Sequence, residues 1–149
     1  MATGRVASIG VDIEAIRPSA GDLADTLFTR REIVQYMAIP PAKQMHAFFR
    51  TWVAKEAYLK ATGEGLAGGL QSFELNPATG LEICPIAIKG SAAGLGQWQF
   101  SGFDVSDDVV GAVAIEADGA AIDLEFCRVD PECLDQSDEW HTIRGERQR

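Results

Sequence analysis

Hydrophobic and polar residues alternate with period two near the start of this chain. Residues 6–14 follow this pattern, which predicts a strand with two different faces. One face is apolar and the other carries a glycine and two acids: Ile9, Val11 and Ile13 lie on the first, and Gly10, Asp12 and Glu14 on the second. We expect the glycine to let a ligand approach the acidic face closely.

The middle of the chain carries the signals of helices. Residues 22–28 predict a short helix, and Thr29 with Glu32 forms a capping-box pattern that opens a second helix before two prolines. A long helix is predicted over residues 42–62, ended by Gly63, because glycine readily adopts the left-handed conformation that closes a helix.

Beyond the long helix the period-two pattern returns, broken by glycine, Asn-Pro and Asp-Asp signals that are typical of turns. The predicted strands span residues 72–75, 81–89, 97–105, 109–116 and 121–129. The pattern as a whole predicts an α+β fold in which an antiparallel sheet packs against the long helix. We expect one domain over residues 1–130, followed by a polar, loosely ordered tail over residues 131–149.

Composition and charge narrow the classes of function. The chain has 149 residues, of which 46% are hydrophobic, and this suffices for one core. The net charge of -9 argues against nucleic-acid binding, because phosphate backbones are bound by clustered Lys and Arg. No apolar stretch is long enough to span a bilayer, and the three cysteines cannot all pair within one chain, so we expect a reduced, cytoplasmic protein without a membrane partner.

The long helix carries an acid within an apolar stripe. The stripe comprises Met45, Phe48, Phe49, Trp52 and Leu59. Glu56 lies in the middle of it, and a buried carboxylate is costly unless it is paired or binds a metal. Lys60 follows on the same side and Lys55 lies on the opposite flank, so two cations bracket Glu56. One explanation is an intrahelical Glu56–Lys60 salt bridge, worth about 0.2–0.5 kcal/mol when exposed.

The acids of the first strand and of the long helix together suggest a metal site. Asp12 and Glu14 occupy positions i and i+2 of the strand, and with Glu56 they would form an all-oxygen site suited to Mg²⁺ that bridges phosphate groups. The alternative for Asp12 and Glu14 is the solvated face of an edge strand.

Two motifs resemble those of the 4'-phosphopantetheinyl transferase superfamily. They are IGVDIE at residues 9–14 and FRTWVAKEAYLK at residues 49–60, the second followed by GEGL at residues 63–66. With acids at both positions of the first motif and LQSF at residues 70–73, the chain is most similar to the second half of the surfactin-synthetase-activating type. The resemblance covers roughly residues 6–73.

The resemblance implies an enzyme that transfers 4'-phosphopantetheine from coenzyme A to a serine of an acyl or peptidyl carrier protein and releases adenosine 3',5'-bisphosphate. It implies that Asp12, Glu14 and Glu56 hold Mg²⁺ against the coenzyme A pyrophosphate. Lys60 and Lys55 would contact the phosphates. Glu56, directly or through a bound water, would also accept the proton of the carrier serine.

Members of the surfactin-synthetase-activating type are two similar halves in one chain, with the ligand between them. The smaller holo-acyl-carrier-protein synthases are single halves that assemble as homotrimers. Because this chain resembles one half, we expect a homo-oligomer, with a dimer preferred over a trimer. Two alternatives stay open: a non-catalytic or partner-dependent half-domain subunit that binds a second chain, and a Mg²⁺-dependent module that acts on another pyrophosphate.

Overall fold

Helices and strands form close to where the sequence predicts them. The structure is a computed structural model, and it describes residues 8–18, 23–65 and 69–117. Its helices and strands are β1 (Ile9–Ala15), α1 (Ala24–Leu27), α2 (Arg30–Met37), α3 (Pro41–Thr62), β2 (Phe73–Leu75), β3 (Pro85–Ile88), β4 (Trp98–Ser106) and β5 (Val109–Glu116). The predicted strand over residues 121–129 and the predicted tail lie outside the described residues, and the domain boundaries stay predictions.

The ends of the helices follow from local sequence signals. The Thr29 hydroxyl accepts a hydrogen bond from the Glu32 N–H (3.2 Å), and the Glu32 carboxylate accepts one from the Thr29 N–H (2.7 Å), which confirms the capping box. Helix α3 has Pro41 in its first turn and ends at Gly63, whose φ of 70° is left-handed. None of the described helices combines the length and the apolar character needed to cross a membrane.

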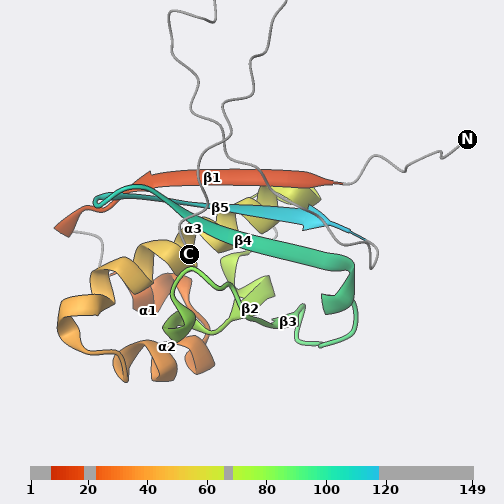
Figure 1. The fold of residues 1–149 in the computed structure, drawn as a ribbon. Coiled ribbons are helices and arrows are strands. Elements are labelled where there is room, and N and C mark those ends of the chain that lie inside the picture. The colour runs from red at the N-terminus through yellow and green to blue at the C-terminus, as the bar shows by residue number, and fades with distance from the viewer. Residues whose placement is uncertain (1–7, 19–22, 66–68, 118–149) are drawn as a thin grey trace, which may run out of the picture.

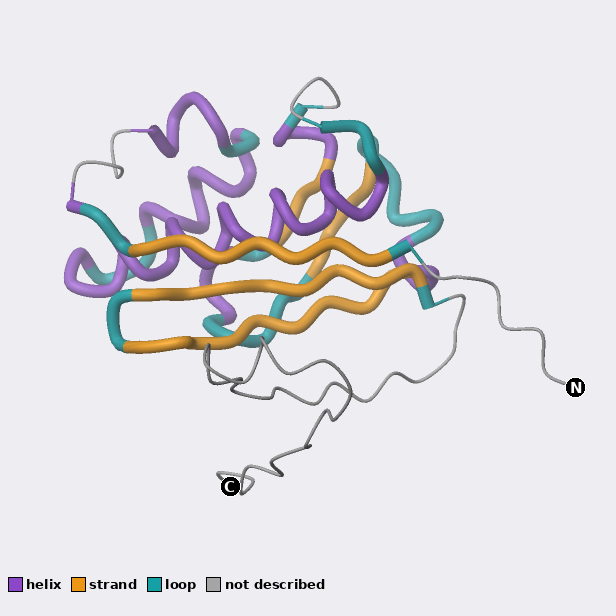
Figure 2. The backbone as a smooth tube through the Cα atoms, turned by 90° about the horizontal axis from the view of Figure 1, so that it is seen from above, coloured by secondary structure: helices purple, strands orange, loops and turns teal. Residues whose placement is uncertain are grey.

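The strands form two antiparallel sheets, where the sequence pattern suggested one. Strand β5 lies between β1 and β4 in a three-stranded sheet, and β2 pairs with β3 separately. Figure 1 shows the helices and the β2–β3 pair on one side of the three-stranded sheet. Figure 2 shows α3 running along that sheet beside β1. The predicted α+β fold, with the long helix across an antiparallel sheet, is therefore confirmed.

Aromatic side chains fill the space between α3 and its neighbours. Phe28 lies against Phe48, with ring centroids 5.4 Å apart. Phe73 lies between Tyr58 and Phe100, at centroid distances of 4.7 and 4.8 Å. These contacts join α3 to the segment between α1 and α2, to β2 and to β4. The core is thus built around α3, which explains why this helix is buried over most of its circumference.

Small residues on the inner face of the three-stranded sheet let α3 lie close to it. Ala112 and Ala114 of β5 are fully buried. A Cβ atom at Gly10 of β1 would lie 2.0 Å from the Ala57 carbonyl oxygen and 2.5 Å from the Ala61 backbone nitrogen. The expectation that Gly10 admits a ligand is therefore wrong, because the backbone of α3 occupies that space.

Strand β1 turns its apolar face away from α3. Ile9, Val11 and Ile13 are 60%, 43% and 52% exposed, whereas Asp12 is 7% exposed. Successive side chains of a strand point to opposite faces, so burial of Gly10 and Asp12 against the helix directs the three apolar residues outward. The result is a row of exposed apolar side chains on one strand, a feature of surfaces that bind another chain.

Gly10→Ala is expected to destabilise the fold, because the added methyl group must push α3 away from β1. Overpacking of this kind costs about 1–3 kcal/mol. Gly96→Ala is the control, since a Cβ atom there meets nothing within 4 Å. Chemical denaturation of both variants measures the difference, and equal stabilities would show that β1 and α3 are not so closely packed.

Candidate functional site

Strand β1 and helix α3 bring Asp12, Glu14, Glu56 and Lys60 into one group. Asp12 and Glu14 project from the face of β1 that packs against α3, and Glu56 and Lys60 lie one helical turn apart on α3. The charges of Asp12, Glu14 and Lys60 all act on the Glu56 carboxyl. The contact between strand and helix thus joins residues from the two sequence motifs, and we call these four residues the acidic cluster.

Asp12 forms an ion pair with Lys60 in this cluster. Lys60 Nζ donates a hydrogen bond to Asp12 Oδ1 over 2.6 Å. The Asp12 side chain is only 8% exposed, so the solvated edge-strand alternative does not hold for it. Its second oxygen, Oδ2, is buried and has no hydrogen-bond partner in the described part of the chain. An unpaired buried carboxylate oxygen is unfavourable, and a further cation or donor would relieve it.

Glu56 is a half-buried acid beside two others. Burial raises the pKa of the Glu56 carboxyl above its ordinary value, the charges of Asp12 and Glu14 raise it further, and Lys60 opposes them. The pKa of Lys60 is raised as well, chiefly by its hydrogen bond to Asp12. Among the described residues, Lys60 forms its ion pair with Asp12 and forms none with Glu56. The intrahelical salt bridge considered from the sequence is therefore not formed.

The chemical type of the cluster suits a hard divalent cation. Asp12, Glu14 and Glu56 offer only oxygen atoms as metal ligands, which Mg²⁺ prefers. Asp12 Oδ2 has no hydrogen-bond partner among the described residues and is available to bind such an ion. Over residues 8–18, 23–65 and 69–117, no three His, Cys, Asp or Glu side chains form a ready-made metal site. Neighbouring carboxylates repel one another when no metal lies between them. In this arrangement Lys60 supplies the compensating charge.

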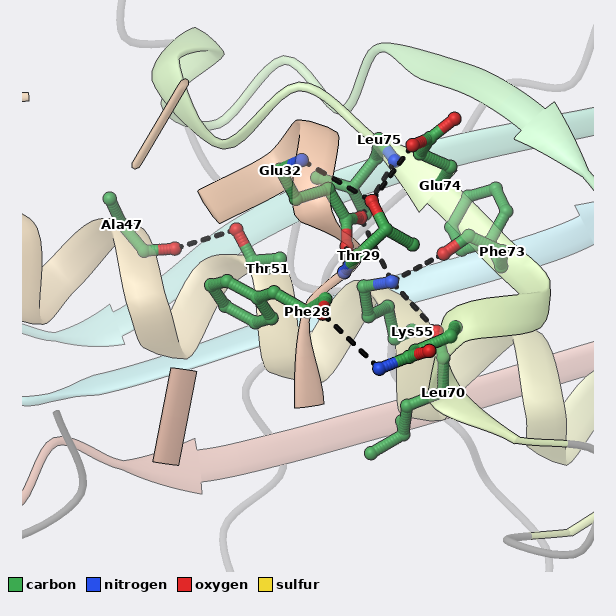
Figure 3. A network of polar contacts seen from close by, with 11 residues as sticks. Phe28, Thr29, Glu32, Ala47, Thr51, Lys55, Leu70, Phe73, Glu74 and Leu75 are labelled. Atoms are coloured by element: carbon green, nitrogen blue, oxygen red, sulfur yellow. Dashed lines mark hydrogen bonds and ion pairs between the residues drawn. The ribbon is translucent and has the colours of Figure 1, made fainter. Parts of the chain in front are cut away.

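Lys55 lies in the core and not in the acidic cluster. Its side chain is fully buried, and its ammonium group pairs with Glu32 of α2 at 2.8 Å. Figure 3 shows the same ammonium donating to the carbonyl oxygens of Leu70, at 2.7 Å, and of Phe73. The expected contact between Lys55 and coenzyme A phosphates is therefore corrected, because the donors of this lysine are used within the protein.

Glu32 completes this buried network, and its part in it was missed from the sequence. One carboxylate oxygen caps α2 through the Thr29 N–H, and the other accepts a hydrogen bond from the Leu75 N–H at 3.0 Å. The Thr29 hydroxyl donates to Glu74 of β2 at 2.8 Å. Burial lowers the pKa of Lys55, and the charge of Glu32 opposes that shift. The pair ties α2 and β2 to α3. Its capping-box signal was visible in the sequence, but its ionic partner was not.

The family model of the 4'-phosphopantetheinyl transferase superfamily matches residues 8–129. The chain therefore belongs to this superfamily, as its two motifs indicated. It is 35% identical over 113 residues to the 4'-phosphopantetheinyl transferase HetI of Nostoc sp. (strain PCC 7120), covering 74% of this chain and 44% of HetI. It is 33% identical over 67 residues to the 4'-phosphopantetheinyl transferase Sfp of Bacillus subtilis (strain 168), covering 45% of this chain and 30% of Sfp. The predicted resemblance to part of such an enzyme is confirmed, and the chain spans less than half the length of these relatives.

A solved structure agrees in fold. The crystal structure of Thermotoga maritima holo-[acyl-carrier-protein] synthase is similar with a TM-score of 0.53 and 17% sequence identity, covering 72% of this chain and 61% of that chain. At this level of identity the similarity supports the architecture alone, which matches the predicted half-domain.

Lys55→Met is expected to destabilise the protein by about 3–5 kcal/mol, because the Glu32 charge would remain buried without its partner. The exposed Lys43 of the same helix supplies the control, and Lys43→Met should change stability by less than about 0.5 kcal/mol. The double variant Lys55→Met, Glu32→Leu should recover part of the loss. Chemical denaturation measures all of them, and strictly additive losses in the double variant would contradict a coupled pair.

Glu56→Gln is expected to change the pH dependence of stability in the metal-free protein. Because folding raises the pKa of Glu56, its ionised form costs stability. That cost is absent below the ordinary glutamate pKa and grows as the pH rises through the raised folded pKa. The glutamine variant should therefore gain on the wild type across this window. Melting curves in EDTA at several pH values test this, with the exposed Glu82→Gln as control; a gap independent of pH would contradict it.

Proposed function

We propose that this chain transfers 4'-phosphopantetheine from coenzyme A to a serine of an acyl or peptidyl carrier protein. The observation that carries the proposal is the acidic cluster itself. A buried Asp12 bonded to Lys60, with Glu14 and Glu56 in electrostatic range, is assembled from the two family motifs at one strand–helix contact. HetI and Sfp, with which the chain shares sequence, are both named 4'-phosphopantetheinyl transferases.

In the proposed reaction the serine oxygen forms a bond to the β-phosphorus of coenzyme A, and the bond to adenosine 3',5'-bisphosphate breaks. Asp12, Glu14 and Glu56 would hold Mg²⁺, which when bound supplies positive charge to the pyrophosphate. The Lys60 side chain is half exposed, and its ammonium group binds the phosphates beside the three acids. Glu56 accepts the serine proton, directly or through a water molecule. Lys55 has no part in this site, since its ammonium is bound in the core.

We propose further that the active unit is a homo-oligomer, with a dimer preferred over a trimer. The acidic cluster accounts for the pyrophosphate of coenzyme A, whereas a binding pocket buries most of a ligand of this size. A second copy would supply the remaining contacts. The exposed row of Ile9, Val11 and Ile13 supports this, because it gives a partner an apolar surface on the edge strand that carries Asp12, on the face opposite to the acidic cluster.

The exposed apolar row on β1 also supports a second candidate function. In this alternative the chain is a partner-dependent half-domain that binds a separate second chain and has no activity alone. Both proposals use the same apolar row on β1, and they differ in what covers it.

Mass spectrometry of apo carrier proteins, incubated with the chain, coenzyme A and Mg²⁺, tests the proposed activity. We expect one added phosphopantetheine group on a carrier, lost with EDTA and with Glu56→Gln but kept with Glu82→Gln. Equilibrium sedimentation of the same samples should place the activity in an oligomer. An active monomer would contradict the assembly, and a chain inactive toward every carrier until a second chain is added would favour the half-domain alternative.

A further inference from the structure

The ion pair between Asp12 and Lys60 joins a buried group to a half-exposed one. Asp12 is 8% exposed and lies on a strand packed against α3, so its carboxylate has little freedom to move. The Lys60 side chain is 52% exposed and reaches Asp12 from the last turn of α3. If this pair separates, the ammonium of Lys60 can return to water, whereas Asp12 must find another cation.

Lys60 is also the counter-charge of the three acids in the acidic cluster. Its positive charge is favoured by Asp12, Glu56 and Glu14, with the hydrogen bond to Asp12 the largest influence. One oxygen of Asp12 is bound by Lys60 and the other is covered and unpaired. A cation that binds Oδ2 puts a second positive charge on a carboxylate that Lys60 already neutralises, and this repulsion favours the departure of one neighbour of Asp12. Lys60 is the neighbour whose departure costs the least free energy, because its side chain is 52% exposed and its ammonium group can be hydrated.

We propose that Lys60 is an exchangeable counter-ion: it holds Asp12 while the acidic cluster lacks a metal, and it leaves Asp12 when a divalent cation binds there. Two cations on the same carboxylate repel each other, and the flexible one moves. The displaced ammonium is then free to bind a phosphate group. This inference rests on the proposed function, because it assigns two successive partners to a residue of that site.

A consequence is that the metal prepares the anion site. Without the metal, Lys60 is neutralised by Asp12 and attracts phosphate weakly. With the metal, the same ammonium is unpaired at the edge of the cluster, so divalent cation and phosphate should each strengthen the binding of the other. In an acidic chain with a net charge of -9, such local release of a cation is a means of binding an anion that long-range charge would repel.

The side-chain NMR signal of Lys60 tests the exchange in the whole chain without coenzyme A or carrier protein. In protein labelled with ¹³C, the Cε–Hε signal of Lys60 is the one missing from Lys60→Met. Titration with MgCl₂ should move it toward the signal of the exposed Lys43. Lys89 is the matched control, because it forms a similar exposed ion pair, 2.7 Å from Glu64, outside the cluster. Its signal should not move.

Calorimetric titration of the same proteins with MgCl₂ supplies the affinity. Removal of the competing charge in Lys60→Met should strengthen Mg²⁺ binding about tenfold. Lys89→Met should leave it unchanged, and Asp12→Asn should abolish it. If Mg²⁺ binds in a manner dependent on Asp12 while the Lys60 signal stays in place, the exchange is overturned and the proposed function stands. If wild-type protein binds no Mg²⁺, both the exchange and the metal in the proposed function are overturned.

Discussion

The close contact between β1 and α3 is the constraint on which the acidic cluster depends. Gly10 lets the helix backbone occupy the space that a side chain would need. Asp12, two residues further along β1, is thereby held against the turn of α3 that carries Glu56 and Lys60. The site is therefore a product of backbone packing: a larger residue at position 10 would separate the aspartate from the lysine without changing either of them.

Two lysines of the same helix serve different purposes because they point in different directions. Lys55 and Lys60 are five residues apart, which is about 140° around the helix. Lys55 faces α2 and β2, where Glu32 and two carbonyl oxygens hold its ammonium in one position. Lys60 faces β1 and is half exposed. A lysine with fixed buried partners stabilises architecture, whereas one at the surface can change partners during binding.

The two faces of β1 connect the acidic cluster with assembly. Successive side chains of a strand point to opposite faces, and α3 covers only the face of β1 that carries Asp12. The side chains on the other face therefore stay exposed. The opposite face carries the apolar row of Ile9, Val11 and Ile13. Strand β1 therefore presents the acidic cluster on one face and, on the other, an apolar surface of the kind that binds another chain.

The sequence by itself determined the described helices and strands, the family and the three acids of the cluster. The capping box at Thr29, the glycine that ends α3 and the two motifs depend on neighbouring residues, and local patterns report such features directly. Only the tertiary structure decided that Lys55 belongs to the core and that Lys60 bonds Asp12 and not the acid one turn before it. The partners of these lysines, Glu32 and Asp12, lie far from them along the chain. Periodicity along one helix shows which side a residue faces, but not which other element lies on that side.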